Sequence, residues 1–360
     1  MARLLDSTPA ADGYRMPAEW EPHARTWLLW PERPDVWRCG AKIAQHTWVE
    51  LATAISRFEP VSVGVNHDQF DHARAMLPSD VRVVEISQND CWVRDSGPSF
   101  VVDDAGGVRL VDWGFNAHGF ALPAWDKDDR VPRKIAEIEG VDRYRAPLIL
   151  EGGSFHVDGE GTVLTTRECL GNPNRNPALD EAEIEGYLKE YLGASAVIWL
   201  ERGLDPDVTS GHVDDVAMFV RPGVVALAWT EDATDWRHEI LEEDLQILER
   251  SRDARGRAIE VYKVPLPAEV ALTEQEASTI DIVEGTLPLQ PGFAQAGSYV
   301  NCVLCNGGLV MPTFDDPADE IARATFQSLF PEREIVTILG REVVLAGGCF
   351  HCITQQQPTE

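Results

Sequence analysis

The chain repeats one kind of segment five times, and this recurrence constrains its fold more than any other feature of the sequence. Each segment has a polar or glycine-bearing start, an apolar strand, a turn and a second apolar strand. The five starts are found at Asp95, Glu151, His212, Ser298 and Cys352. They lie 54 to 61 positions apart, except for one interval of 86 before Ser298. Modules at near-regular spacing usually stack or close about an axis, so their polar starts could meet there.

Helical patterns separate these segments. Apolar residues recur at roughly helical spacing in three stretches of the chain, 41–58, 180–192 and 234–251. A further long helix is predicted from its end signals, with a capping carboxylate and a proline at Asp316-Pro317 and a stop at Phe330-Pro331. Strands alternate with these helices, so the sequence predicts an α/β fold. We expect one closed domain over residues 1–360, with an insertion around 274–290 and with residues 1–15 free to form a disordered tail.

Composition narrows the class of protein. Hydrophobic residues at 44% and charged residues at 25% are typical of a soluble globular chain. With neither a long apolar run nor a signal-peptide core, the sequence predicts a cytoplasmic protein without a membrane span. Its 31 basic and 60 acidic residues give a net charge of −29, which repels nucleic acid and anionic lipid and attracts small cations. Seven cysteines, an odd number, favour free thiols over a disulfide framework.

Ionisable side chains stand at four module starts, where strand alternation predicts apolar ones. They are Asp95, Glu151, the pair His212 and Asp214, and Cys352. Cys352 follows an apolar run at 343–345, which predicts a strand, and two glycines that allow a turn presenting the thiol. His212 and Asp214 would share one face of a strand. Each residue alone has a structural explanation, but their recurrence at corresponding positions favours a common site.

These residue types suit one kind of chemistry. A planar cation with several N–H donors is best held by carboxylates, because each carboxylate can accept two parallel hydrogen bonds. A thiolate that attacks carbon needs a low pKa or a nearby base, and a histidine can transfer the protons. Two carboxylates, a histidine and a cysteine are therefore the groups needed to hydrolyse a guanidinium, and this chemistry requires no metal or cofactor.

Several motifs resemble those of the agmatine deiminase family and occur in the family's order. They are MPAEWEP at 16–22, WPERP at 30–34, NDCWVRDSGP at 89–98, WGFNA at 113–117, LEGGS at 150–154, NPNRNP at 172–177, GHVD at 211–214 and HCITQQQP at 351–358. The resemblance runs from about residue 16 to residue 358. It implies the five-bladed α/β propeller, or pentein fold, of the guanidine-modifying enzymes, built from ββαβ modules and related to bacterial-type peptidylarginine deiminases.

The resemblance also implies a reaction. Agmatine would be hydrolysed to N-carbamoylputrescine and ammonia. Cys352 would attack the guanidinium carbon and form a covalent thiouronium intermediate. His212 would protonate the departing ammonia and then activate water.

Roles for the other site residues follow from the same resemblance. Asp95 and Asp214 would clamp the guanidinium nitrogens, Glu151 would orient His212 and contact the substrate, and Trp92 would cover the aliphatic part. The expected partner is thus a small cationic guanidino compound. We also expect a homo-oligomer, a dimer.

Five positions depart from the family pattern as the resemblance gives it. They are His118 for a tryptophan, Val208 for a glutamate, Ser210 for an asparagine, Ala294 for an arginine and Cys349 for an asparagine. None is one of the five catalytic positions. We expect all of them to lie where the far end of the substrate is read, and therefore to affect the choice of substrate more than the reaction.

Other functions stay open at this point. The substrate could be another guanidino amine, free arginine or peptidyl arginine, or the amidino group could pass to an amine. Arginine would need a cation for its carboxylate, for which Arg202 is one candidate. A non-enzymatic alternative is a zinc site formed by the pairs Cys302/Cys305 and Cys349/Cys352. Cysteines three apart in a strand point to opposite faces, which argues against zinc.

Overall fold

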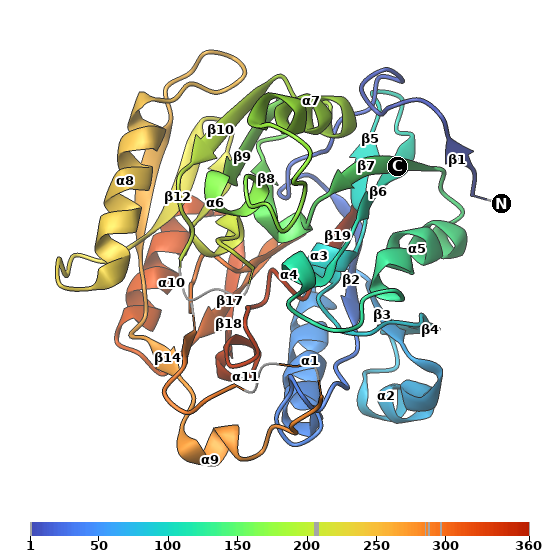
Figure 1. Cartoon of the computed structure of the whole chain (residues 1–360), viewed down its shortest axis with the longest axis vertical. Coiled ribbons are helices and arrows are strands. Elements are labelled where there is room, and N and C mark those ends of the chain that lie inside the picture. Colours follow the sequence, from blue (N-terminus) through green and yellow to red (C-terminus); the bar gives the residue numbers. More distant parts are fainter. Residues whose placement is uncertain (1, 205–208, 285, 287–288, 296, 360) are drawn as a thin grey trace.

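The computed structural model describes residues 2–204, 209–284, 286, 289–295 and 297–359 and has a mixed α/β fold (Figure 1). The described residues form five sheets of three or four strands and one two-stranded pair. In strand order the sheets are β19 (Gln355–Pro358), β2 (His23–Leu29), β3 (Val61–Val65) and β4 (Arg82–Glu85); β1 (Leu4–Leu5), β7 (Arg143–Ile149), β6 (Val108–Gly114) and β5 (Ser99–Val102); β10 (Ala196–Leu200), β9 (Thr162–Thr166) and β8 (Phe155–Val157); β11 (Ala217–Arg221), β12 (Val224–Trp229) and β13 (Glu260–Pro265); β16 (Val303–Cys305), β17 (Gly308–Thr313) and β18 (Glu334–Leu339); and the pair β14 (Val270–Ala271) with β15 (Ala294–Gln295).

All five sheets are built in the same way. An antiparallel pair continues into a parallel pair in β19–β2–β3, β5–β6–β7, β8–β9–β10, β11–β12–β13 and β16–β17–β18. The first strand of each set follows one of the five predicted module starts: β5 follows Asp95, β8 follows Glu151, β11 follows His212, β16 follows Ser298 and β19 follows Cys352. The five recurring segments of the sequence thus correspond to five sheets of one pattern.

Helices follow the first parallel strand in most modules. The longer helices are α1 (Lys42–Ile55), α5 (Val131–Glu139), α7 (Glu181–Leu192), α8 (Trp236–Arg250) and α10 (Ala318–Leu329). Short helices are α2 (Phe70–Met76), α3 (Val93–Ser96), α4 (Ala117–Phe120), α6 (Arg167–Leu170), α9 (Glu274–Ala277) and α11 (Arg341–Val344), and 3-10 turns are η1 (His67–Gln69), η2 (Asp128–Arg130), η3 (Gly152–Ser154) and η4 (Val213–Asp215). Figure 1 shows α5, α7, α8 and α10 toward the outside of the molecule, with strands in its interior. The four long helices predicted from the sequence are confirmed as α1, α7, α8 and α10, whereas α5 was not predicted.

Helix α7 shows how local sequence sets an element. The Asp180 side chain accepts a hydrogen bond from the backbone N–H of Glu183, and the Glu183 side chain accepts one from the backbone N–H of Asp180. Gly193 ends the helix in the left-handed conformation, at φ 66°. Ile184 and Leu188 are buried between these ends, so the amphipathic pattern positions the helix on the core.

Three local expectations were wrong. Residues 2–15 do not form a disordered tail, because β1 pairs with β7 and the backbone N–H of Arg3 donates to Asp142. The run at 343–345 is not a strand, since α11 covers most of it. His212 and Asp214 do not lie in a strand either, because 213–215 form η4 and the strand β11 begins only at Ala217.

The N-terminal tryptophans support the pocket described below. Trp27, Trp37 and Trp48 are almost fully buried. Trp27 donates to the Oε1 of Gln357 at 2.8 Å, joining β2 to β19 across 330 positions of sequence. Trp37 stacks on Trp92 with ring centroids 5.2 Å apart.

In the part of the chain that the structure describes, every helix is too short or too polar to traverse a lipid bilayer.

Candidate active site

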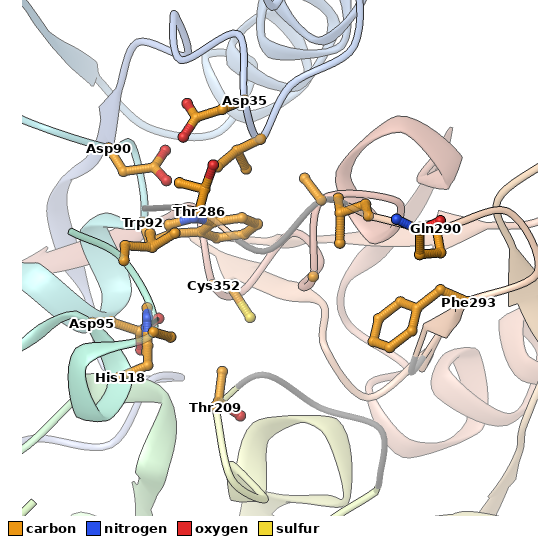
Figure 2. A pocket seen from close by; sticks show the side chains of 16 residues that line it. Asp35, Asp90, Trp92, Asp95, His118, Thr209, Thr286, Gln290, Phe293 and Cys352 are labelled. Atoms are coloured by element: carbon orange, nitrogen blue, oxygen red, sulfur yellow. Dashed lines mark hydrogen bonds and ion pairs between the residues drawn. The ribbon is translucent and has the colours of Figure 1, made fainter. Parts of the chain in front are cut away.

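Two module starts, Asp95 and Cys352, line one pocket with a volume of about 390 Å³, shown in Figure 2. Asp214 contacts Cys352, His212 contacts Asp95, and Glu151 lies beside His212, so these residues pack directly behind the lining. Asp95 lies in α3, Glu151 immediately before η3, His212 and Asp214 at η4, and Cys352 beyond the glycines that follow α11. The described residues that line the cavity are Asp35, Val36, Asp90, Trp92, Asp95, His118, Ala121, Leu122, Thr209, Thr286, Leu289, Gln290, Phe293, Ala346, Gly347 and Cys352. Residues separated by most of the chain therefore meet at one place, as the recurrence predicts.

Cys352 presents its thiol to this cavity from a tightly packed turn. Its Sγ lies 3.5 Å from the Oδ2 of Asp214, and the Asn301 side chain donates to the Sγ at 3.1 Å. A Cβ on Gly348 would lie 2.8 Å from the Trp92 ring and 3.1 Å from the Sγ, so the turn requires glycine there. Burial raises the pKa of the Cys352 thiol well above its usual value, and the neighbouring carboxylates raise it further.

Asp95 receives hydrogen bonds on both carboxylate oxygens. The N–H of Gly153 donates to Oδ1 at 3.0 Å, and Oδ2 lies 3.1 Å from the Nε2 of His118. Oδ1 also lies 3.7 Å from the Nδ1 of His212. Burial would raise the pKa of Asp95, but the two imidazoles and the Gly153 N–H outweigh it and hold the pKa below its usual value. Asp95 is therefore an anion aimed at the base of the pocket.

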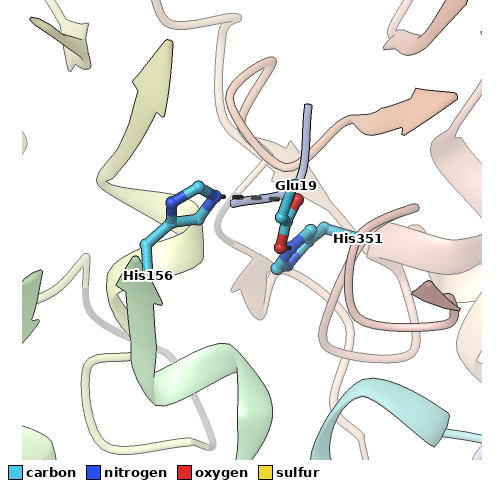
Figure 3. A group of neighbouring side chains, drawn as sticks. All are labelled: Glu19, His156 and His351. Atoms are coloured by element: carbon cyan, nitrogen blue, oxygen red, sulfur yellow. Dashed lines mark hydrogen bonds and ion pairs between the residues drawn. The ribbon is translucent and has the colours of Figure 1, made fainter. Parts of the chain in front are cut away.

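Asp214 is the second carboxylate at Cys352, and a chain of buried groups holds it from behind; Figure 3 shows Glu19 and His351 of this chain. The Nδ1 of His351 lies 2.7 Å from Oδ2 of Asp214, and its Nε2 lies 2.8 Å from Oε1 of Glu19. Arg94 donates to the same Glu19 oxygen at 3.3 Å. The other oxygen of Asp214, Oδ1, lies 4.0 Å from the Nδ1 of His212 and has no hydrogen-bond partner among the described residues. One carboxylate thus contacts both the thiol and the imidazole.

The charges in this chain support one another. Burial and the Arg94 guanidinium would lower the pKa of His351, but Glu19 and Asp214 outweigh them and raise it above its usual value. Burial would raise the pKa of Glu19, but His351, Arg94 and His156 hold it well below its usual range. With a carboxylate oxygen beside each ring nitrogen, His351 is an imidazolium that donates to both neighbours.

The group Glu19, His156 and His351 has the composition of a metal site but not the tautomers. Its possible ligand atoms lie within 4.8 Å of one another. However, the N–H of Phe219 donates to the Nδ1 of His156, so the proton of the neutral ring is on Nε2, which faces Glu19 at 3.6 Å. A ring nitrogen that carries a proton cannot bind a metal, so the group is better understood as a charged support for Asp214.

The zinc alternative is not supported. The only other described group of three possible ligands within 4.8 Å is Glu151, Cys169 and His212. The cysteines of the two predicted pairs, Cys302, Cys305, Cys349 and Cys352, belong to neither group. They do not provide the tetrahedral set of sulfurs that structural zinc requires.

Glu151 is fully buried and lies near His212, but it also has a partner that the sequence did not reveal. Its Oε1 accepts from the Nε of Arg175 at 2.9 Å, and both side chains are completely inaccessible to solvent. Arg175 also donates to the carbonyl of Thr209 at 2.6 Å and to the hydroxyl of Ser210 at 3.1 Å. This ion pair fixes Glu151 beside His212 and connects it to the segment before η4.

Above the base, the pocket wall is mainly apolar, with two carboxylates farther out. Trp92 forms one side, and Figure 2 shows Asp35 and Asp90 beyond it. Both oxygens of Asp35 accept from Arg33, at 2.9 and 2.7 Å. No lysine or arginine is among the described residues that line the cavity. The pocket therefore combines acidic groups at both ends with an apolar middle.

Not every departure from the family pattern lies at the far end of the substrate. His118 hydrogen-bonds to Asp95, so the expectation that it lies at the far end was wrong. Ser210 contacts Arg175. Ala294 lies in β15, Cys349 is fully buried, and Val208 lies outside the described residues.

Sequence reasoning missed four residues that hold this site together: Glu19, Arg175, Asn301 and His351. Three of them occur in motifs that carry the resemblance, at 16–22, 172–177 and 351–358. That was the available signal, because an arginine or glutamate inside a motif far from any module start is still a candidate partner for a buried charge. Asn301 lay in an apolar run and had no such signal.

Comparison with known proteins agrees with this geometry. The sequence pattern of the Porphyromonas-type peptidyl-arginine deiminase family matches residues 15–358. The chain is 55% identical to the agmatine deiminase of Pseudomonas aeruginosa (strain LESB58), over 98% of this chain and 97% of that one. It is 51% identical to the agmatine deiminase of Ectopseudomonas mendocina (strain ymp), over 98% of each. Its structure is similar to that of agmatine deiminase of Enterococcus faecalis, with a TM-score of 0.97, 46% identity and full coverage of both chains.

Proposed function

Because the chain belongs to the Porphyromonas-type peptidyl-arginine deiminase family, we propose that it is an agmatine deiminase, which hydrolyses agmatine to N-carbamoylputrescine and ammonia. Full-length relatives named agmatine deiminase support this substrate. The observation that carries the proposal is that Asp95 and Cys352 line one pocket while Asp214 contacts the Cys352 thiol at 3.5 Å.

Substrate binding comes first. The guanidinium lies between Asp95 and Asp214, and the Oδ1 of Asp214 can accept one of its N–H groups. In the empty pocket, burial and nearby carboxylates keep the Cys352 thiol protonated. A bound cation offsets the negative charge around the sulfur and so lowers the pKa of the thiol. The substrate thereby favours the thiolate that attacks it.

The chemical steps then follow in two halves. The Cys352 thiol passes its proton to His212, the sulfur bonds to the guanidinium carbon, His212 gives that proton to one nitrogen, and the C–N bond breaks to release ammonia. A thiouronium remains on the cysteine. His212 takes a proton from water, the hydroxyl adds to the carbon, and the C–S bond breaks. The departing thiolate takes the proton back from His212, and the protonated ureido product loses its proton to solvent, so one water is consumed for each ammonia formed.

The other residues of the pocket determine how the rest of the substrate is held. Trp92 covers the aliphatic chain, and Glu151 orients His212 while its charge is matched by Arg175. Free arginine is a poor fit, because its carboxylate would meet acidic groups and no described cation in the pocket wall. Arg202, the cation considered from the sequence, instead pairs with Glu243 and Glu239.

Ammonia release from a panel of guanidino compounds tests this function. We expect agmatine to exceed arginine, a peptidyl arginine and shorter or longer guanidino amines by at least about tenfold in kcat/KM, or about 1.4 kcal/mol. Cys352→Ala should abolish release, whereas Cys39→Ser, at an exposed cysteine, should leave it unchanged. Equal turnover of the whole panel would contradict the assignment of agmatine as the substrate. Full activity in Cys352→Ala would contradict the proposed mechanism.

Three broader expectations belong to the same proposal. The five similar sheets and the pairing of β19 with β2 support a single domain closed as a five-bladed propeller. A homodimer and a cytoplasmic location stay predictions. Sedimentation of the purified chain tests the first of these, and fractionation of cells that express it tests the second.

A further inference from the structure

His118 places a second imidazole at the base of the pocket, beside His212. Its Nε2 lies 3.1 Å from Oδ2 of Asp95, and its ring centroid lies 5.8 Å from that of His212. The ring also meets Phe115 edge-on at 5.3 Å. The side chain is 6% exposed and lines the cavity, as Figure 2 shows. Nothing in the proposed reaction uses this residue.

The backbone that carries His118 is held in an unfavourable conformation. Ala117, His118 and Phe120 all have left-handed φ angles, of 54°, 55° and 67°. Residues with a Cβ avoid this region unless the surroundings impose it, and such residues cluster at functional sites. The Asn116 side chain accepts from the N–H of Gly119 at 2.9 Å and donates to the carbonyl of Asn174 at 2.9 Å. The turn is therefore fastened in a way that directs His118 at Asp95.

The charges around His118 come from several elements. Asp95 is the nearest, His212 faces the ring, and Glu151 and Arg175 act from farther away. Asp90 and Asp128 line a small cavity that His118 also lines. Burial would lower the pKa of His118, but its hydrogen bond and charge interaction with Asp95, together with Glu151, outweigh burial and raise it.

We propose that His118 is a substrate-binding determinant, and that the guanidinium displaces a proton from it. As an imidazolium, His118 neutralises Asp95 and repels a second cation beside it. As a neutral imidazole it still donates from Nε2, so Asp95 keeps its orientation while the repulsion disappears. The substrate therefore binds the form with neutral His118. This inference rests on the proposed function, because it takes Asp95 as a guanidinium ligand.

Binding of agmatine to the Cys352→Ala protein, followed by titration calorimetry from pH 5.5 to 9, tests the proposal without turnover. At pH values below the raised pKa of His118, the dissociation constant should fall by about tenfold for each unit that the pH rises, because only the protein with deprotonated His118 binds. In that range, buffers with different ionisation enthalpies should report about one proton released for each agmatine bound.

The matched variant is His118→Gln in the same Cys352→Ala background. Glutamine keeps an N–H donor for Asp95 but cannot carry an additional proton, so the pH dependence and the proton release should both largely disappear. His67→Gln, at an exposed histidine, should leave both unchanged.

The two proposals fail in different ways. If Cys352→Ala binds no agmatine at any pH, the proposed function is wrong. If it binds agmatine with a dissociation constant that does not vary with pH, the inference about His118 is wrong and the function stands. A pH dependence that persists fully in His118→Gln would assign the proton to another group, such as Asp128, whose pKa burial raises to about 7, and would also overturn the inference.

Discussion

Asp95 and Asp214 stand on either side of the proposed reaction, and each contacts an imidazole, but the two are supported differently. Asp214 is held at 2.7 Å by His351, whose other nitrogen is matched by Glu19 in the interior. Asp95 is held at 3.1 Å by His118, which lies in the pocket wall. One support is insulated from the substrate, whereas the other is next to it. A carboxylate pair can therefore combine a fixed charge with one that responds to pH and ligand.

Replacing each carboxylate by its amide should have the largest effect, and the two replacements should differ in what they do to stability. Asp95→Asn and Asp214→Asn should each reduce kcat/KM by about 10³-fold, because each loses a charged contact to the reacting group. Asp214→Asn should also lower the free energy of unfolding by about 2–3 kcal/mol, since it removes a charged hydrogen-bond partner from a buried imidazolium. Asp95→Asn should cost only about 1 kcal/mol, because His118 can lose its proton.

Ammonia release and urea unfolding measure these two quantities on the same preparations. Equal losses of stability in the two variants would show that the supports do not differ. Full activity in either variant would show that the replaced carboxylate does not bind the reacting group.

Glu19→Gln tests the insulated support alone. We expect a loss of about 3 kcal/mol in the free energy of unfolding at pH 7, because His351 and Arg94 lose a buried anion. Activity should fall by about tenfold through loosening of Asp214, equivalent to about 1.4 kcal/mol. Glu21→Gln is the control, since Glu21 pairs with Arg15 at the surface and should cost at most about 1 kcal/mol.

The same variant gives a dependence on pH. Because the pKa of Glu19 is well below its ordinary value in the folded protein, its contribution to stability is fully present above the pKa of an unfolded glutamate, 4.5, and is lost as the pH falls toward the folded value. The difference in unfolding free energy between wild type and Glu19→Gln should therefore shrink below pH 4.5. A difference that stays constant from pH 7 to pH 3.5 would contradict the assignment of charge.

The sequence predicted the members of the site better than their supports. Asp95, Glu151, His212 and Cys352 stand at corresponding module positions, and the structure has Asp95 and Cys352 in the pocket wall, His212 against Asp95, and Glu151 beside His212. Glu19 occupies no such position, and it meets His351 across 332 positions of sequence. Contacts of that kind depend on how separate sheets pack, which a local pattern does not encode.

Local conformation was also predicted unevenly. Periodicity identified α1, α7 and α8, because packing of one apolar face decides them, and end signals identified α10, but α5 was not predicted. It failed at 213–215 and 343–345, where a turn must aim side chains at the pocket. The family pattern marked His118 as unusual, but its place against Asp95 follows from a left-handed turn at residues other than glycine, which sequence patterns rarely predict.

The smallest effects are expected at the outer ends of the two supports. His156→Gln removes a ring that stacks on His351 at 6.0 Å, and Phe115→Leu removes one that contacts His118 at 5.3 Å. Each should reduce kcat/KM by about two- to fivefold, or roughly 0.5–1 kcal/mol. Only Phe115→Leu should change how agmatine binding varies with pH. Calorimetry of both variants in the Cys352→Ala background measures this dependence. An altered pH dependence in His156→Gln would show that the support of Asp214 also responds to pH.

The pairing of β19 with β2 has a consequence for biosynthesis. Because Cys352 lies just before β19, we expect its thiol to reach the pocket only when Gln355–Pro358 pairs with a strand made more than 300 residues earlier, at His23–Leu29. While the ribosome is still at work, the emerging polypeptide has an unpaired, largely apolar edge and no thiol in place. We therefore expect the site to form only after β19 has paired with β2, and the unpaired edge of β2 to need protection from aggregation until then.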